Sequence, residues 1–482
     1  MKKKKSLILA FVVLVLLVTA CSSGTPVSTG GETEPSNNAA EPPSGNNAEP
    51  TESTGNSGDN SAAGGDGGEQ APAEKIAYKY DPATTGEITF WTWDAMFKEV
   101  IGEFKKVYPN IKVNMVQIEI GQLHDRLQTT IAAGKGAPDV SHVLGVDRYG
   151  APGLLEDLLD PKYDMGRYED KTAPYVWERW KSVDGKRLLA PPWDIGPAVF
   201  YYREDIYEQM GLPSDPEELG EFLQNEDNVF LAAQTLAANG IYMYEWRDSP
   251  AIQFGDASGY FDSEMNYLRN NERMVELLDL VKRGVQIGWA PQKSVLFSDE
   301  GKELLKQGKV ASFPAASNGS RHLANVVPEQ KGKWRATKVP LGVNASLVGS
   351  SFVIPSQSKN KEAAFAFLEF IAVDEAAWKI YVKNAVQSGW KHITSLPWYQ
   401  DYENEFLGGQ KEFAFYDTLV DSIPVRRYTP LDGQAWPIYI DLINQSIDKN
   451  IDSKTTLQQI ETNTLRQLGP EIEKLKKEQG IE

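Results

Sequence analysis

The residue types that catalysis or metal binding would need are present but lie far apart in the sequence. The four histidines include no HExxH motif and no pair spaced i, i+4. They are His124, His142, His322 and His392. A single cysteine in 482 residues allows neither an intrachain disulfide nor a cysteine-based zinc site. No GxSxG or GxxxxGK[ST] motif occurs and no GxGxxG follows a predicted strand, so we expect no metal and no cofactor.

Pairs of carboxylates are the remaining candidates for chemistry. Glu156/Asp157 and Asp205/Glu208 offer the two acids that glycoside hydrolysis needs, provided that they face each other across a bond. With 67 Asp and Glu against 49 Lys and Arg, such pairs arise by chance, and we expect them to be solvated surface. The formal net charge of −18 repels phosphate backbones, which excludes nucleic acid as the main partner.

The first residues have the pattern of a secretory signal. Lys2 to Lys5 precede an uncharged apolar run over 7–18, which is shorter than the roughly 20 residues that a membrane-spanning helix needs. We predict that residues 1–20 are a signal peptide. Cys21 directly follows Val-Thr-Ala, which resembles the bacterial lipobox, and we predict that its thiol is lipidated. The alternative is an ordinary cysteine at the end of a transmembrane helix.

The composition changes after this cysteine. Residues 22–75 contain no aromatic residue, Leu, Ile or Met, and are rich in Ser, Gly, Asn, Pro and Glu. Such a segment buries too little apolar surface to offset the entropy of ordering. We predict that 21–75 is a lipidated Cys followed by a disordered acidic tether, with a root-mean-square span on the order of 40 Å.

Periodicity predicts the elements of the folded part, which starts near Ile76. Residues 87–93 indicate a strand, 95–108 an amphipathic helix, 111–115 a second strand, 123–131 a second helix and 140–144 a third strand. This alternation is typical of a parallel α/β sheet. Asp215 before Pro216 predicts a helix start, and further helices are expected over 360–373 and 457–477.

Several short segments resemble, in the same order, the extracellular solute-binding proteins, family 1, of bacterial ABC transporters, the maltose-binding-protein-like group. The segments are Trp91-Thr92-Trp93-Asp94, Gly134 to Val140, Gly145 to Gly150, Gly153 to Leu158, Pro192 to Gly196, Phe200 to Asp205, Met210 to Pro213, Gly308 to Ala311, Gly349 to Ser351 and Ser358 to Ala363. Each motif alone is weak, but their shared order behind a lipobox-like start makes the resemblance specific. It covers about residues 76–482.

The resemblance implies a two-lobed periplasmic-binding-protein-like α/β fold of the class II type, with a hinge between the lobes and a ligand cleft at their interface. It places 76–195 and 345–375 in the first lobe, and 196–344 and 376–482 in the second. The implied function is capture of a carbohydrate, a mono- or oligosaccharide, and delivery to the transmembrane subunits of an ABC permease. The protein would be a non-catalytic, lipid-anchored monomer on the outer face of the bacterial cell membrane.

Site residues are carried over position by position. Trp91, Trp93, Asp94, Asp147 and Arg148 match ligand-contacting segments of the first lobe, Trp193 and Asp194 match a hinge crossing, and Trp436 matches an aromatic platform of the second lobe. The family often shows Gly-x-Trp where this chain has Ala316-Ser317-Asn318, so Asn318 becomes a candidate contact. Trp246, Trp289 and Trp390 are candidates to replace the missing aromatic. Trp177, Trp180 and Trp378 are expected in the core, where an isolated Trp more often lies.

Two other functions stay open on the sequence alone. The chain is alternatively a cell-surface enzyme that acts on glycans, which would show itself by product release. It is otherwise a wall-associated sensor module that binds a protein. A carbohydrate receptor is the leading prediction because the motif order and the secretory start agree.

Overall fold

The computed structural model describes residues 76–480, which begin with three strands of a four-stranded sheet. The predicted signal peptide, Cys21 and the predicted tether lie outside the described residues. β1 (Gly86–Thr92) pairs in parallel with β2 (Ile111–Gln117) and β3 (Val140–Val143), as the alternation predicts. The sheet order is β2-β1-β3-β8, and β8 (Ser351–Val353) is antiparallel to β3.

Apolar helices pack against this sheet. α1 (Phe97–Val107) turns its spaced apolar residues inward, and Phe97 and Phe104 are fully buried. Phe90 of β1 meets Phe97 and Phe367 edge to face at centroid distances of 5.2 and 5.1 Å. Phe367 belongs to α11 (Lys361–Val373), which is buried from residue 363 onward and corresponds to the helix predicted over 360–373. α2 (Ile120–Ala132) also contacts β1.

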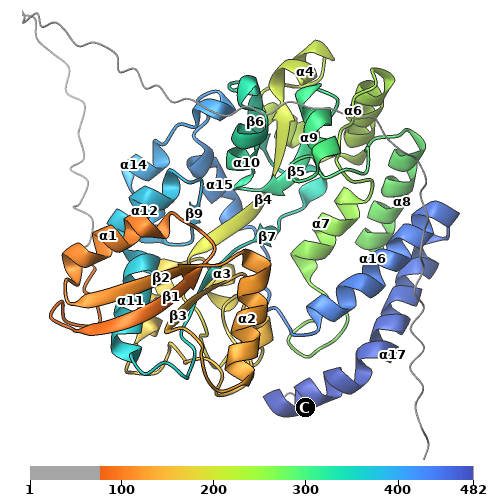
Figure 1. Ribbon diagram of the computed structural model, residues 1–482. Helices are drawn as coiled ribbons and strands as arrows, with labels where there is room; N and C mark the ends of the chain where they lie inside the picture. The colour runs from red at the N-terminus through yellow and green to blue at the C-terminus, as the bar shows by residue number, and fades with distance from the viewer. Residues whose placement is uncertain (1–75, 481–482) are drawn as a thin grey trace, which may run out of the picture. The chain divides into compact units, whose positions relative to one another are not determined.

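A second sheet is built around the long strand β4 (Asp194–Arg203). In Figure 1 this strand extends from beside the first sheet toward β5. β5 (Ser312–Ala316) and β6 (Trp334–Thr337) pair antiparallel with its later residues. β7 (Ser346–Val348) and β9 (Gln387–Ser388) pair with its first residues. Because β7 ends three residues before β8 begins, the chain passes from one sheet to the other here, beside the start of β4.

Helices surround the second sheet. Asp215 accepts hydrogen bonds from the amides of Glu217 and Glu218, which confirms the predicted start of α5 (Pro216–Phe222). α7 (Ser249–Ser258), α8 (Glu272–Gln286), α16 (Asp432–Lys449) and α17 (Ser453–Gln479) form a layer of their own, at the right in Figure 1. The remaining α-helices are α3 (Pro174–Glu178), α4 (Glu204–Gln209), α6 (Glu226–Ala238), α9 (Asp299–Lys306), α10 (Gly319–Val326), α12 (Glu375–Val382), α13 (Lys391–Thr394), α14 (Pro397–Gln400) and α15 (Glu412–Val420).

One expected limit between the lobes differs from the packing. The boundary at 375/376 places α12 in the second lobe, whereas α12 packs against α1. The ring of Tyr381 lies 5.8 Å from that of Phe97, and Trp378 lies 6.2 Å from Trp193. Because these large apolar side chains are buried only where the first sheet covers them, we place α12 with that sheet. The other limits stay predictions.

Candidate functional site

A cleft lined from both halves of the fold is the candidate site. A large cavity of about 530 Å³ has walls from α7, α16, β5 and β7. A small cavity of about 190 Å³ lies beyond the end of β3 and is lined by His124, Leu144, Gly145, Asp147, Arg148, Arg179 and Tyr428. A narrow gap shares Asp256 with the large cavity and shares Arg179 and Tyr428 with the small one. The three spaces therefore adjoin one another, and together they are called the cleft.

Two exposed indoles distinguish the large cavity. The side chains of Trp246 and Trp436 are 40 % and 41 % exposed, although most tryptophans of the described residues are buried. Trp436 lies on α16, and Trp246 precedes α7. Exposed aromatic surface is costly in water unless a ligand covers it. The cavity therefore offers two flat apolar surfaces to a ligand.

Acidic and amide side chains complete the large cavity, whose lining includes no Lys or Arg. Burial raises the pKa of Glu245 to about 7, although the Val295 amide and the Trp246 indole bond to its carboxylate. Burial also raises the pKa of Asp248 and of Asp256. Such groups accept hydrogen bonds when charged and donate one when protonated, which suits a ligand rich in hydroxyls.

The small cavity has the opposite character, because two guanidinium groups line it. Arg179 is only 8 % exposed, and its Nη1 donates to Ser346 Oγ at 3.1 Å. Arg148 is exposed and follows Asp147 in a short 3₁₀ turn after β3. Burial, followed by the nearby Arg148 charge, lowers the pKa of His124, so this ring is neutral at pH 7. A parallel sheet places such residues at the carboxyl ends of its strands, where ligands bind.

The predicted site residues divide into three groups. Asp147, Arg148 and Trp436 line the cleft. Four further residues lie near the passage between the sheets without lining these cavities. They are Trp93, stacked on His142 at 3.6 Å, Asp94, 3.9 Å from Arg321 of α10, Asp194, which accepts from Ser350 Oγ at 3.2 Å, and Asn318, directly before α10. Burial raises the pKa of Asp194 to about 7.

The third group is buried away from the cleft. Trp91, Trp193 and Trp390 expose at most 3 % of their surface. The ring of Trp193 packs between aromatic side chains of the first sheet and its helices, including Phe352 at 4.8 Å. Trp390 meets Tyr168 edge to face at 5.8 Å. In this arrangement none of the three indoles is accessible to a ligand, so their predicted contact stays a prediction that the packing does not support.

Sequence reasoning missed part of the cleft wall. Glu245, Asp248 and Asp256 were not singled out, nor were Arg179 and Tyr428. One local signal was available for Arg179, since a cation stands between two tryptophans that pack in the core, at 177 and 180, as predicted. A charge in such a setting is either paired or directed into a cavity. For Tyr428 we find no local signal.

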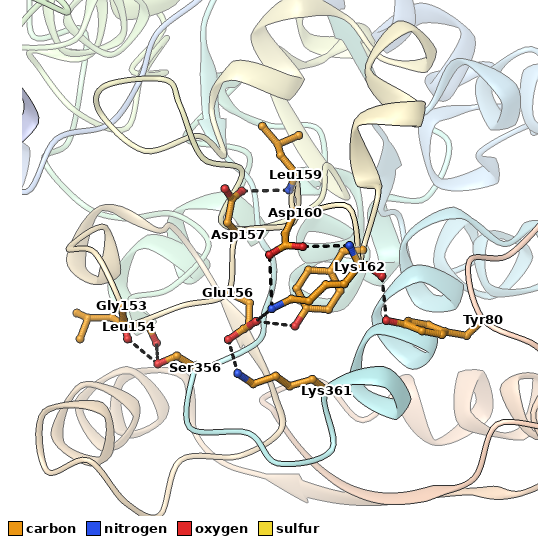
Figure 2. Close-up of polar contacts among 11 residues, drawn as sticks. Tyr80, Gly153, Leu154, Glu156, Asp157, Leu159, Asp160, Lys162, Ser356 and Lys361 are labelled. Atoms are coloured by element: carbon orange, nitrogen blue, oxygen red, sulfur yellow. Dashed lines mark hydrogen bonds and ion pairs between the residues drawn. The ribbon is translucent and has the colours of Figure 1, made fainter.

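The acid pairs suggested by the sequence have structural partners. Figure 2 shows the Glu156 carboxylate between Lys162 and Lys361. The two ion pairs measure 2.6 and 2.7 Å, and the Tyr163 hydroxyl donates to the same carboxylate. Burial alone would raise the pKa of Glu156, but these three hydrogen bonds hold it below its usual value. Asp157 accepts from the Leu159 amide at 3.0 Å, also drawn there.

In the second acid pair, Asp205 also forms an ion pair. Asp205 forms two bonds of 2.7 Å with the Arg203 guanidinium. Neither this pair nor Glu156/Asp157 lines the cleft. Glu156, Asp157 and Asp205 therefore hold local structure and Glu208 is exposed, so the two pairs do not converge on the cleft.

Residues 76–480 contain no candidate metal centre and no candidate membrane span. No group of three or more His, Asp or Glu side chains there has the arrangement of a metal centre. None of the helices in that range is long and apolar enough to cross a bilayer.

Comparison with known proteins gives a family and a fold. The family described as bacterial extracellular solute-binding protein matches residues 91–378. The arabinooligosaccharide-binding protein of Bacillus subtilis (strain 168) is 26 % identical over 310 residues, which are 59 % of this chain and 68 % of that protein. The lactose-binding protein of Rhizobium radiobacter is 26 % identical over 373 residues, or 72 % of this chain and 85 % of that protein.

A solved structure confirms the predicted fold class. The ABC transporter associated binding protein from B. animalis subsp. lactis Bl-04, in complex with beta-1,6-galactobiose, superposes with a TM-score of 0.64 at 21 % identity. The match covers 80 % of this chain and 98 % of that one. The fold is the two-lobed α/β fold of such binding proteins, with the cleft between the lobes.

Proposed function

The chain belongs to the family of bacterial extracellular solute-binding proteins, and from this premise we propose that it captures a carbohydrate for an ABC importer. One observation carries the proposal. The large cavity presents two exposed indoles, Trp246 and Trp436, beside carboxylate and amide side chains. The two curated relatives are binding proteins for an arabinooligosaccharide and for lactose, which supports the same ligand class.

The chemistry of the cavity fits a sugar. A pyranose ring has C–H faces that stack on an indole, and a rim of hydroxyls that needs donors and acceptors. Glu245 and Asp248 supply acceptors, and Gln253 and Asn444 supply both. An unpaired buried polar group costs about 1–3 kcal/mol, so the pattern of hydroxyls decides which sugar is retained.

Transport would use closure of the cleft. A ligand that contacts both walls stabilises the closed arrangement only by its differential affinity for it. We propose that Asp147 and Arg148 contact the ligand from one side and Trp436 from the other, with Asp94 and Asp194 near the passage between the lobes. The closed protein would then dock on the transmembrane subunits of the permease and release its ligand there.

The same proposal includes the placement of the protein. Cleavage after residue 20 and lipidation of Cys21 would hold it at the outer face of the bacterial cell membrane. Residues 22–75 would act as a tether, and a monomer suits docking on a permease. Mass spectrometry of the membrane fraction tests this part, since a Cys21→Ser variant should lose the diacylglyceryl mass and leave the membrane.

Thermal unfolding in the presence of solutes is the test of the function. The full-length chain, in mild detergent, is mixed with lactose, arabinooligosaccharides, mannitol, other mono- and disaccharides, amino acids and peptides. A ligand at about 100 times its dissociation constant stabilises by about 2.7 kcal/mol, so the midpoint should rise for one class of saccharide. The same samples are then analysed for products by chromatography.

Each other outcome favours a different function. Release of a shorter saccharide would indicate a glycan-acting enzyme and contradict a transport receptor. A well-folded sample that responds to no saccharide would move the assignment to the protein-binding sensor, and a response to amino acids or peptides alone would replace the ligand class.

A further inference from the structure

Within residues 76–480, the two arginines of the small cavity form no ion pair with a carboxylate. Arg148 and Arg179 both line this cavity. Neither guanidinium lies within 4.0 Å of a carboxylate oxygen of residues 76–480, whereas most other arginines there form such ion pairs. Two guanidinium groups and one carboxylate, that of Asp147, therefore line one space of about 190 Å³, and neither guanidinium forms an ion pair of 4.0 Å or less.

Neutral groups hold Arg179 in place. Besides Ser346, it donates to the carbonyl of Gly349 at 3.5 Å, and its Cζ lies 4.7 Å from the ring centre of Tyr428. A Cβ at residue 349 would come within 3.1 Å of that Cζ, so the glycine admits the guanidinium. A buried charge held only by neutral groups is costly unless a counter-charge is supplied. The Arg179 guanidinium and its hydrogen-bond donors are thus held in one position before a ligand binds.

The nearby acids do not fill this role. Burial raises the pKa of Asp147, against which the backbone amides of Asp147 and Arg148 and the Arg148 charge act, so this carboxylate is directed to its own turn. Asp194 forms no direct ion pair with Arg179: its carboxylate accepts from Ser350, the Arg179 charge acts on it only from beyond 4.0 Å, and burial raises its pKa to about 7. The small cavity therefore keeps a net positive character.

The rest of the cleft limits where an anion can bind. Glu245, Asp248 and Asp256 line the large cavity. Asp248 is nine-tenths buried, and no other residue of the described chain donates to its carboxylate. A ligand anion would be repelled from this end and attracted to the arginines, so charge gives the cleft a direction.

We propose that the small cavity binds the carboxylate of a uronic acid unit, so that the ligand is an oligosaccharide with one acidic sugar at the arginine end and a neutral sugar on the indoles. A planar carboxylate matches the fork geometry of a guanidinium. This inference rests on the proposed carbohydrate function and adds the substrate class of the same cleft.

Matched pairs of sugars test the inference by isothermal titration calorimetry on the full-length chain in mild detergent. The pairs are galacturonic acid with galactose and cellobiouronic acid with cellobiose; digalacturonic acid and glucose 6-sulfate complete the set. The acidic member of a pair should bind at least tenfold more tightly than the neutral member. Its affinity should fall as salt rises from about 0.05 to about 0.5 M, because salt shortens the Debye length and screens the attraction between the carboxylate and the arginines.

The outcomes separate this inference from the function on which it rests. Equal or tighter binding of the neutral members would overturn the uronate site and leave the carbohydrate receptor intact. Preference for glucose 6-sulfate would overturn the carboxylate assignment. If no saccharide of either kind bound, the proposed function itself would fail.

Variants localise the effect. Arg148→Gln should weaken the acidic sugar by about 10- to 100-fold more than its neutral partner, because a charge-assisted hydrogen bond is lost. Arg179→Gln should do the same; if that buried change prevents folding, the exposed Arg148 alone decides. Arg466→Gln, an exposed arginine on α17 outside the cleft, is the matched control and should leave both affinities unchanged. An unchanged ratio in Arg148→Gln would overturn the site.

Discussion

Replacing Trp436 with alanine is expected to weaken saccharide binding about tenfold. Trp436 is 41 % exposed. Since a tryptophan has an accessible surface of up to about 250 Å², about 100 Å² of Trp436 is open to a ligand. A sugar stacks on one of the two faces of the ring and so covers about 50 Å². At about 25 cal/mol per Å², this contact contributes about 1.3 kcal/mol, or nearly a factor of ten in Kd.

Trp246 is 40 % exposed in the same cavity, so its replacement with alanine should also weaken saccharide binding about tenfold. No ring contact joins Trp246 and Trp436 in the part of the chain that the structure describes, so their contributions should add. The double alanine variant is therefore expected to lose about 100-fold. Because both side chains are substantially exposed, the variant should keep its fold.

Calorimetric titration with the saccharide that raises the midpoint most is the assay. Phe297→Ala is the matched control, because Phe297 is an even more exposed aromatic, at 68 %, and does not line the cavity. The control should retain full affinity. A double variant within threefold of the unmodified protein would refute the reasoning that the two indoles form the sugar platform.

Three further predictions concern stability. Glu156→Gln should lower Tm at pH 7; since the folded pKa lies below the usual 4.5, the loss should shrink as the pH falls through the folded value, and a loss independent of pH would contradict the ion pairs. Burial raises the pKa of Asp194 from 3.8 to about 7, so ionisation of this carboxyl destabilises the fold as the pH rises from 3.8 to 7. The Asp194→Asn variant should therefore have a Tm roughly 1–3 °C higher than the unmodified protein at pH 8 and nearly the same Tm at pH 3. A lower Tm of the variant at pH 8 would contradict this prediction. Gly284→Ala places a Cβ 2.2 Å from the Trp289 indole and should cost about 1–3 kcal/mol in denaturant unfolding, whereas an unchanged midpoint would show that the indole can move.

Local pattern was sufficient for the strands and helices that open the first sheet and for a few later helices. Alternation of apolar residues identified the parallel strands of the first sheet, and Asp215 before Pro216 identified a helix start. These features depend on neighbours within a few residues, where sequence is most informative. The expected limit at residue 375 differed because α12 belongs where its aromatic side chains find a partner surface, and that surface is formed by residues far earlier in the chain.

The candidate site was predictable only in part. Trp436 and Trp193 were predicted from motif positions, and Trp390 was a candidate to replace the missing aromatic; Trp436 lines the large cavity, whereas Trp193 and Trp390 lie in the core. An indole at the end of a strand has the same sequence signature whether it lines a cleft or fills a core. Trp246 was only one of three candidates until the structure placed it beside Trp436.

The sequence by itself determined the alternation of strands and helices that opens the first sheet, the apolar faces of those elements, and the acidic net charge. Only the tertiary structure decided which side chains share the cleft, since Arg148, Arg179, Asp256 and Tyr428 come from distant parts of the chain. It also decided that Glu156 forms ion pairs with two lysines, whereas Arg148 and Arg179 form no ion pair within the described residues. The physical reason is that periodicity is set by neighbours along the chain, whereas burial and counter-charge depend on what the fold brings near in space.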